Sequence, residues 1–341
     1  MIADAPRIAV VGATGAVGTT ILELIHDRKF QHSHIDAVAS DRSAGSTVPF
    51  AGAELEVQAL STFDFSDTDI AFFSAGTSVS QKWAREAASA GALVIDNTNA
   101  FRMDPDSPLI VPQVNGGLAE VRPTSGIIGN PNCSTIPLVR VLHSLQSWSP
   151  RTVIVTTFQA ASGQGLRGLD ELRNSSRAVI AENAVDRRES DRFGRMLAFD
   201  VLPMIDVPLD TGFSLEEQKM TQESIKILNN PDIAVTATCV RVPVFNCHSE
   251  SVYIEFEDRV DVGEVVQALS TAVEVTVYPN ATEFPSPATI CDHDRVHVGR
   301  IRAVPGNPHA LWLWLVADNV RIGAALNAIQ IAERVNIGAV A

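Results

Sequence analysis

The sequence has no long apolar run. Its longest uninterrupted one, residues 310–317, is eight residues long, whereas a helix needs about 20 to cross a bilayer. A signal core is also missing, because Gly12, Gly15 and Gly18 interrupt the apolar stretch that begins at Ile8. The sequence therefore predicts no membrane span and a cytoplasmic location.

Cysteine is scarce as well. Four cysteines in 341 residues are too few for a disulfide scaffold, and in a reducing compartment they are free thiols. We expect Cys239, Cys247 and Cys291 to be buried packing residues. The fourth, Cys133, differs because its neighbours are polar.

Positive charge is in short supply. The chain has 40 acidic and 26 basic residues, a net charge of −14, and only four of the basic residues are lysines. Such a surface repels the phosphates of nucleic acids and anionic lipids. The composition therefore disfavours DNA, RNA and membrane partners, and an anionic ligand would have to be bound by individual arginines.

The first 130 residues have the alternating pattern of a parallel α/β domain. With 45% hydrophobic and 19% charged residues the chain has a globular composition, and its length predicts two domains. Short apolar runs alternate with amphipathic stretches. The predicted strands are 7–11, 35–39, 69–73, 92–95 and 126–129, and the predicted helices are 17–27 and 79–90. We expect a doubly wound, Rossmann-type domain over residues 1–132.

The pattern changes at about Pro150, and a second domain, for catalysis, substrate binding and dimerisation, is expected over residues 133–318. Longer β-rich runs occur at 151–160, 233–242, 251–256 and 310–316, with helical patterns at 166–184, 216–228 and 262–273. This mixture predicts an α+β domain with a largely antiparallel sheet covered by helices on one face. A last helix, at about 319–341 and clearest over 319–335, is expected to pack back on the first domain.

A glycine-rich turn, GATGAVG, follows the first predicted strand and opens the first predicted helix. Glycine there lets the backbone approach a pyrophosphate, whose charge the helix N-terminus favours. The spacing is GxxGxxG rather than GxGxxG, and such turns also occur for steric reasons alone. The surrounding strand and helix favour a dinucleotide site.

The end of the second predicted strand is where such a domain contacts the adenosine ribose. A carboxylate there suits the 2′-hydroxyl of NAD, whereas Arg and Ser suit the 2′-phosphate of NADP. Ser40, Arg42 and Ser43 indicate NADP. Asp41 could instead serve NAD or face solvent, and a solvated loop is the simpler alternative.

Cys133, in GNPNCST, lies close to the start of a predicted amphipathic helix. The helix dipole and the free amides of a helix N-terminus lower a thiol pKa and favour the nucleophilic thiolate. The same amides could hold an oxyanion. Because its polar flanks argue against core packing, we predict that Cys133 is a nucleophile.

Several charged residues could assist a thiolate in acyl transfer. A proton-transfer partner is needed, and His248 lies in a predicted polar turn. Arg241, on an apolar strand, is costly to bury without an anion. Arg102, just past a predicted strand, could bind phosphate or form a surface salt bridge. Glu216 and Lys219 are spaced as an ordinary exposed ion pair.

The segment CDHDRVHVG contains three chemically plausible zinc ligands, Cys291, His293 and His297. Val296 and Val298 indicate a strand that follows an irregular loop, and no matching second cluster appears in the sequence. We therefore predict no metal site there.

Together, several segments resemble those of aspartate-semialdehyde dehydrogenases, in the same order, from residue 7 to about 333. They are GATGAVG, SDRSAG, DNTNAFR, NPNCST, QAASGQG, EEQKMT, CVRVPV with HSES, and LVADN with GAALNAIQIAE. The resemblance implies an oxidoreductase that converts L-aspartyl 4-phosphate to L-aspartate 4-semialdehyde with NADPH, in the biosynthesis of diaminopimelate, lysine, threonine and methionine. It also implies a homodimer or homotetramer.

The resemblance further implies roles for individual residues. Cys133 would form a thioacyl enzyme, His248 would handle protons and Gln159 would orient the intermediate. The substrate contacts would be Arg102 and Lys219 for phosphate, Arg241 for the carboxylate, Glu216 near the ammonium, and Gln159. The cofactor contacts would be Gly12, Thr14, Gly15, Ala16, Val17, Arg42, Ser43, Ser162, Gly163 and Asn319.

Two alternative functions remain open. N-acetyl-glutamyl-phosphate reductases use the same thioacyl chemistry on a similar fold, although their nucleophile usually lies in a PGCYPT-like context rather than NPNCST. A catalytically silent relative that binds a nucleotide or a partner is the other alternative.

Overall fold

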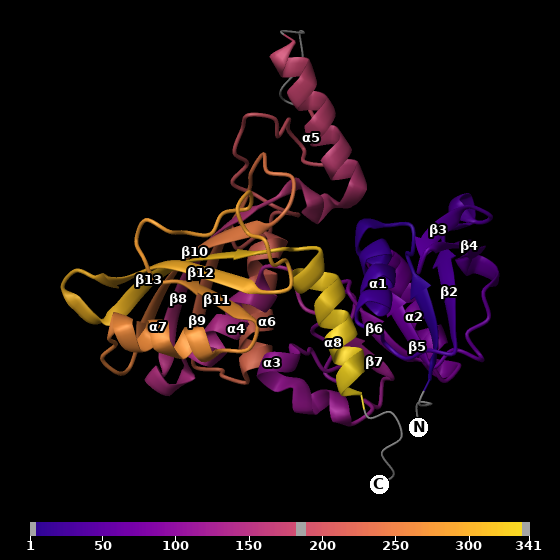
Figure 1. The fold of residues 1–341 in the computed structure, drawn as a ribbon, viewed down its shortest axis with the longest axis horizontal. Coiled ribbons are helices and arrows are strands. Elements are labelled where there is room, and N and C mark those ends of the chain that lie inside the picture. The colour runs from indigo at the N-terminus through magenta and orange to yellow at the C-terminus, as the bar shows by residue number, and fades with distance from the viewer. Residues whose placement is uncertain (1–4, 182–188, 336–341) are drawn as a thin grey trace. The chain divides into compact units, whose positions relative to one another are not determined.

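The computed structural model describes residues 5–181 and 189–335 (Figure 1). Contacts divide the chain into two compact units, Met1–Asn132 with Ala324–Ala341, and Cys133–Gly323. The last residues of two predicted helices, 182–184 and 336–341, lie outside the described part.

The first unit is built on a seven-stranded sheet of order β3-β4-β2-β1-β5-β6-β7. Its strands are β1 (Arg7–Val11), β2 (His34–Ala39), β3 (Thr47–Phe50), β4 (Ala53–Ala59), β5 (Ile70–Phe73), β6 (Leu93–Asp96) and β7 (Ile127–Gly129). All neighbours are parallel except β3 and β4. The expected doubly wound fold is confirmed, but the β3–β4 hairpin, which the sequence analysis missed, makes the sheet mixed.

Helices cover this sheet because its strands are apolar on both faces. Every residue of β5 and β6 is buried. The helices of the unit are α1 (Ala16–Asp27), α2 (Thr77–Ser89), the short α3 (Pro112–Asn115) and α8 (Leu326–Arg334). The C-terminal α8 packs on α1 and β6, and Glu333 accepts two hydrogen bonds from Arg28, each 2.8 Å long. A π-helical turn, η6 (Arg321–Ala325), precedes α8 where a continuous helix was expected.

The second unit contains a six-stranded sheet of order β11-β12-β13-β10-β8-β9. Its strands are β8 (Pro150–Gln159), β9 (Ala234–Arg241), β10 (His248–Phe256), β11 (Val275–Tyr278), β12 (Val296–Val304) and β13 (Asn307–Ala317). The three central pairings are antiparallel, and the two outer ones, β11–β12 and β8–β9, are parallel. The expected α+β unit with a mostly antiparallel sheet is confirmed.

Among the described residues, helices cover only one face of this sheet. The helices α4 (Thr135–Ser144), α6 (Leu215–Leu228) and α7 (Val262–Thr271) pack against the sheet and one another, while α5 (Gly165–Ile180) follows the 3-10 turn η5 (Ala161–Gln164). Along β8 and β10 buried residues alternate with partly exposed ones. The uncovered face carries apolar side chains, including Ile154, which is 47% exposed.

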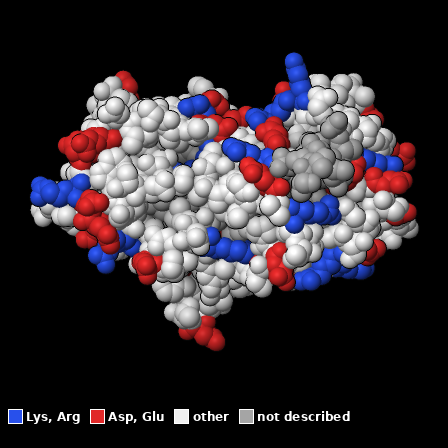
Figure 2. All heavy atoms as spheres, turned by 90° about the horizontal axis from the view of Figure 1, so that it is seen from below, with Lys and Arg blue, Asp and Glu red and all other residues white. Residues whose placement is uncertain are grey.

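Surface charge is mixed on the face that Figure 2 shows. Lys and Arg side chains lie among Asp and Glu there, without an extended basic area on that face. In the described part of the chain, every helix is too short or too polar to span a bilayer.

Candidate active site

Cys133 lies immediately before Ser134, the N-cap residue of α4, and its side chain is partly exposed. The backbone of Gly323 approaches it closely, because a Cβ at that glycine would lie 2.9 Å from the Cβ of Cys133 and 3.0 Å from its carbonyl oxygen. The thiol is therefore held at a helix N-terminus, where the helix dipole favours the thiolate.

A polar network surrounds Gln159, the last residue of β8. Its Nε2 donates to the hydroxyl of Ser134 and to Oε1 of Glu216, both at 3.1 Å. Oε2 of Glu216 accepts from Nζ of Lys219 at 3.2 Å, and Lys219 also donates to Asp206 at 2.6 Å. The interpretation of Glu216 and Lys219 as an exposed pair is wrong, since Glu216 is 6% exposed: α6 turns these residues toward the sheet.

Arg241 ends β9, directly beside Gln159 in the sheet register. It is buried, and Nη1 donates to the carbonyl oxygen of Ala160 at 2.7 Å. Burial lowers the pKa of Arg241, whereas the carboxylate of Glu216 and the thiolate of Cys133 raise it. No carboxylate in the described part of the chain forms a hydrogen bond with its guanidinium, which leaves donors for an anionic ligand.

His248 is the first residue of β10, and the expectation that it lies in a polar turn is wrong. It is buried, and Nδ1 accepts a hydrogen bond from the amide of Ala160 at 3.0 Å. The proton of the neutral ring is thereby placed on Nε2, which has no hydrogen-bond partner among the described residues. Burial, and then the charge of Arg241, lower the pKa of His248 to about 3. The ring is a neutral donor at pH 7.

Gly163 leaves the space that Arg241 and His248 need. A Cβ at this glycine would lie 2.7 Å from Nη1 of Arg241 and 3.5 Å from Cε1 of His248. The second unit thus brings together a thiol, a neutral imidazole donor, a buried arginine and an amide. This set can form and stabilise an acyl-thiol intermediate of an anionic substrate.

Arg102 belongs to the first unit. It is buried, and its guanidinium donates to the backbone carbonyls of Asn130 and Asn97, each at 2.9 Å. The alternative of a surface salt bridge is therefore wrong for this arginine, because its side chain is buried.

A cavity of about 440 Å³ lies at the glycine-rich turn of the first unit. Gly12 has φ +94° there, and a Cβ on it would lie 2.6 Å from the carbonyl oxygen of Ser74. A Cβ on Gly18 would lie 2.1 Å from the carbonyl oxygen of Gly12. The cavity is lined by Gly12, Thr14, Gly15, Ala39, Ser40, Asp41, Arg42, Ser43, Leu60, Ser61, Ser74, Ala75, Val79, Lys82 and Trp83.

These residues fit a dinucleotide. Ala16 and Val17 are the first residues of α1, and the N-cap Gly15 has no side chain to occupy the free amides, which suits a pyrophosphate. Asp41 accepts a hydrogen bond from the hydroxyl of Ser61 at 2.5 Å, so its carboxylate has a partner within the protein.

Some cavity residues escaped the sequence analysis. Ser74 and Ala75 follow β5, and the rule that ligands lie beyond the carboxyl ends of parallel strands could have found them. No sequence pattern would have predicted that Lys82 lines the cavity. Its ammonium lies 4.5 Å from the centroid of the Trp83 ring. The other expected cofactor contacts, Ser162, Gly163 and Asn319, lie in the second unit, where Ser162 donates to Oδ1 of Asn319 at 2.9 Å.

The remaining cysteines differ in environment. Cys239 and Cys247 are buried as expected, and burial raises the pKa of both thiols, that of Cys247 to about 12. The expectation for Cys291 is wrong, because this residue is exposed on the irregular loop before β12.

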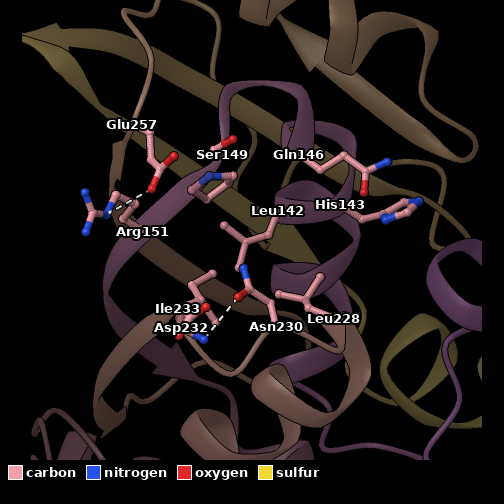
Figure 3. Close-up of a pocket in the computed structure, with 11 residues that line it drawn as sticks. Leu142, His143, Gln146, Ser149, Arg151, Leu228, Asn230, Asp232, Ile233 and Glu257 are labelled. Atoms are coloured by element: carbon pink, nitrogen blue, oxygen red, sulfur yellow. Dashed lines mark hydrogen bonds and ion pairs between the residues drawn. The ribbon is translucent and has the colours of Figure 1, made fainter.

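A larger cavity, of about 580 Å³, lies elsewhere in the second unit (Figure 3). An ion pair of 3.5 Å joins Arg151 to Glu257 there. The lining residues are Leu142, His143, Gln146, Ser149, Pro150, Arg151, Leu228, Asn230, Asp232, Ile233 and Glu257. None of the site residues expected from the sequence is among them.

Comparisons with known proteins identify the family of this chain. Two family models match, "Semialdehyde dehydrogenase, NAD binding domain" over residues 7–120 and "Semialdehyde dehydrogenase, dimerisation domain" over residues 142–322. The aspartate-semialdehyde dehydrogenase of Bacillus subtilis is 43% identical over 335 residues, which is 96% of each chain. That of Aquifex aeolicus is 43% identical over 331 residues, covering 96% of this chain and 97% of the relative. The chain belongs to the aspartate-semialdehyde dehydrogenase family.

Solved structures of the family share this fold. Aspartate-semialdehyde dehydrogenase II of Vibrio cholerae, described as complexed with ASA, matches with a TM-score of 0.93 and 41% identity over 97% of this chain and 98% of that one. The Candida albicans enzyme, described with NADP, matches with a TM-score of 0.74 and 25% identity over 97% of this chain and 98% of that one.

Proposed function

We propose that this protein catalyses the reductive dephosphorylation of L-aspartyl 4-phosphate to L-aspartate 4-semialdehyde, with NADPH as the reductant. The observation that carries this proposal is the cluster of Cys133, Gln159, Arg241 and His248 in a chain of this family. Nothing in the site favours an N-acetylated substrate or a silent relative.

The chain's own residues account for the covalent steps. The thiolate of Cys133 attacks the acyl carbon, and the bond to phosphate breaks, so that phosphate leaves with the electron pair and a thioacyl enzyme remains. Arg241 binds the α-carboxylate and Glu216 the ammonium of the substrate. Nε2–H of His248 donates to the carbonyl oxygen, which carries negative charge in each tetrahedral intermediate. Gln159 orients the thioester.

The cofactor fits the first unit. Gly12, Gly15 and the start of α1 would hold its pyrophosphate, and Arg42 and Ser43 the 2′-phosphate. Reduced NADP, when bound, supplies the hydride that takes the thioester to the oxidation level of the aldehyde. Collapse of the resulting hemithioacetal oxyanion then returns the sulfur to the thiolate of Cys133. Arg102 and Lys219 are proposed to bind phosphate.

We also propose that the protein is a homodimer formed through the uncovered face of the second sheet. Ile154 on β8 and two aromatic pairs lie on that face. The ring centroids of Tyr253 and Trp312 are 5.4 Å apart, and those of Phe158 and Trp314 are 5.5 Å apart. Large aromatic side chains of this kind are typical of interface cores.

We propose that the protein is located in the cytoplasm. A free thiol that acts as a nucleophile suits a reducing compartment such as this one.

The test is the reverse reaction, in which aspartate semialdehyde and phosphate reduce NADP. The absorbance of the reduced cofactor measures its rate. We expect turnover only when phosphate is present, and loss of turnover in Cys133→Ala. Equal rates with N-acetylglutamate semialdehyde would contradict the substrate. Full activity of Cys133→Ala would contradict the mechanism, and Cys291→Ala, an exposed thiol, is the matched control.

A further inference from the structure

A cluster of three potential metal ligands lies outside the proposed catalytic set. Cys247, His293 and Asp318 each offer one ligand atom, and these atoms all lie within 4.8 Å of one another. Nδ1 of His293 is 2.8 Å from Oδ2 of Asp318 and 4.0 Å from Sγ of Cys247. We propose that these three side chains form a binding site for a zinc ion.

The donor set and its dimensions suit zinc. Bonds of about 2.0 to 2.3 Å place neighbouring donors of a tetrahedral zinc ion about 3.3 to 3.8 Å apart. The nitrogen–oxygen contact of 2.8 Å therefore has to widen, and the sulfur–nitrogen contact of 4.0 Å to narrow, by about 0.5 Å each. The sulfur–oxygen distance, which is at most 4.8 Å, has to narrow by up to about 1.3 Å. Sulfur and imidazole ligands select zinc over magnesium or calcium. Three protein ligands leave the fourth position open.

Two of the ligands are already oriented. Oδ1 of Asp318 accepts from the amides of Val320 and Arg321, at 2.9 and 3.0 Å, so that Oδ2 is the oxygen that contacts His293. Cys247 has a φ of +70°. Residues with a side chain pay a steric cost in this left-handed region, and glycine does not. The chain nevertheless has a cysteine at this position.

The site has a route to solvent and a balanced charge. The side chain of His293 is 42% exposed, whereas that of Asp318 is 11% exposed. Zinc would displace the thiol proton of Cys247 to solvent and replace the hydrogen bond between His293 and Asp318 by two bonds to the ion. The thiolate, the carboxylate and the neutral imidazole then neutralise the two positive charges.

The position of the site links it to the catalytic strand. Cys247 precedes His248, and Asp318 precedes Asn319 in sequence. The amide of Cys247 donates to Oδ1 of Asn319 at 3.1 Å, and His248 pairs with Ala317 in the register of β10 and β13. A bound ion would therefore tie the ends of these two strands together and restrict the proposed catalytic histidine.

The experiment uses cobalt(II) as a spectroscopic probe, because zinc itself is spectroscopically silent. The titration is made on Cys133→Ser, so that the proposed nucleophile cannot supply a thiolate. We expect a thiolate-to-cobalt charge-transfer band that saturates at one equivalent and is abolished by adding zinc. Adding Cys247→Ser should remove the band, and adding His293→Ala should weaken cobalt binding at least about tenfold. Adding Cys291→Ser, an exposed thiol on the same loop, should leave the band unchanged.

A thermal melt gives a second readout. Zinc should raise the Tm of Cys133→Ser but not the Tm of the double variant that also carries His293→Ala. The side chain of His293 is 42% exposed, so it can be removed without opening the core. Absence of a charge-transfer band in Cys133→Ser, or a band of full intensity after Cys247→Ser, would overturn the proposal. Loss of the band with Cys291→Ser but not with Cys247→Ser would also overturn it. None of these outcomes depends on turnover.

Discussion

Oε1 of Glu216 accepts a hydrogen bond from Nε2 of Gln159 at 3.1 Å, and the same nitrogen lies 3.1 Å from the hydroxyl of Ser134. One amide thus connects the end of β8 with α6 and with the residue that follows Cys133. This side chain therefore contributes to the orientation of both Glu216 and Ser134.

Gln159→Ala is expected to lower kcat/KM about 10²-fold, because the thioester loses the side chain that orients it. Steady-state kinetics of the phosphate-dependent reaction give the value. Gln31→Ala, at an exposed position of the first unit, is the matched control and should retain full activity. A loss of less than about threefold in Gln159→Ala would remove this residue from the proposed machinery.

Glu250 predicts a pH dependence of stability. Both of its carboxyl oxygens are buried without a hydrogen-bond partner among the described residues, and burial raises its pKa well above the ordinary value of 4.5. The unfolded chain releases this proton at a lower pH than the folded chain. The contribution of Glu250 to the free energy of unfolding therefore falls as pH rises above about 4.5 and through the folded pKa.

Glu250→Gln removes this titration, so the variant should gain stability relative to the parent as pH rises. Urea unfolding midpoints measured between about pH 5 and about pH 8 would show the difference growing. Glu54→Gln, at an exposed position, should show no such trend. A constant difference between Glu250→Gln and the parent across this range would contradict the interpretation.

Arg42 tests the choice of cofactor. Arg42 and Ser43 line the cavity beside the glycine-rich turn, while the carboxylate of Asp41 accepts from Ser61. A hydrogen bond to a charged group contributes about 1.5 to 3 kcal/mol, so Arg42→Ala should weaken NADP binding about ten- to a hundredfold and NAD binding much less. Dissociation constants from fluorescence titration would give the ratio. Equal losses for NADP and NAD would count against a 2′-phosphate contact.

Ile154 tests the proposed dimer. A charged residue in the centre of an apolar interface is buried without a partner and destabilises the association. Ile154→Arg should therefore shift the protein from dimer to monomer in sedimentation velocity experiments. Val121→Arg changes an exposed apolar residue of the first unit and should leave the dimer intact. A dimer that persists in Ile154→Arg at micromolar concentration would place the interface elsewhere.

Local sequence patterns were sufficient for much of the fold. The strand predicted over 7–11 is β1, and the helix predicted over 17–27 is α1 with one more residue at its start. The hairpin of β3 and β4 was missed because it lies at the sheet edge, where most of its side chains are exposed. Such short strands carry little apolar periodicity.

The sequence by itself determined the glycine-rich turn, the placement of Cys133 at a helix start and the family, because these depend on residues that are neighbours in the chain. Only the tertiary structure decided that Glu216 is buried, that His248 is a neutral donor, and that Cys247, His293 and Asp318 meet. Burial and partners arise from contacts between segments far apart in sequence. A local sequence pattern cannot predict the burial or the partners of a residue, because the same spacing of charges occurs on exposed and on buried helix faces.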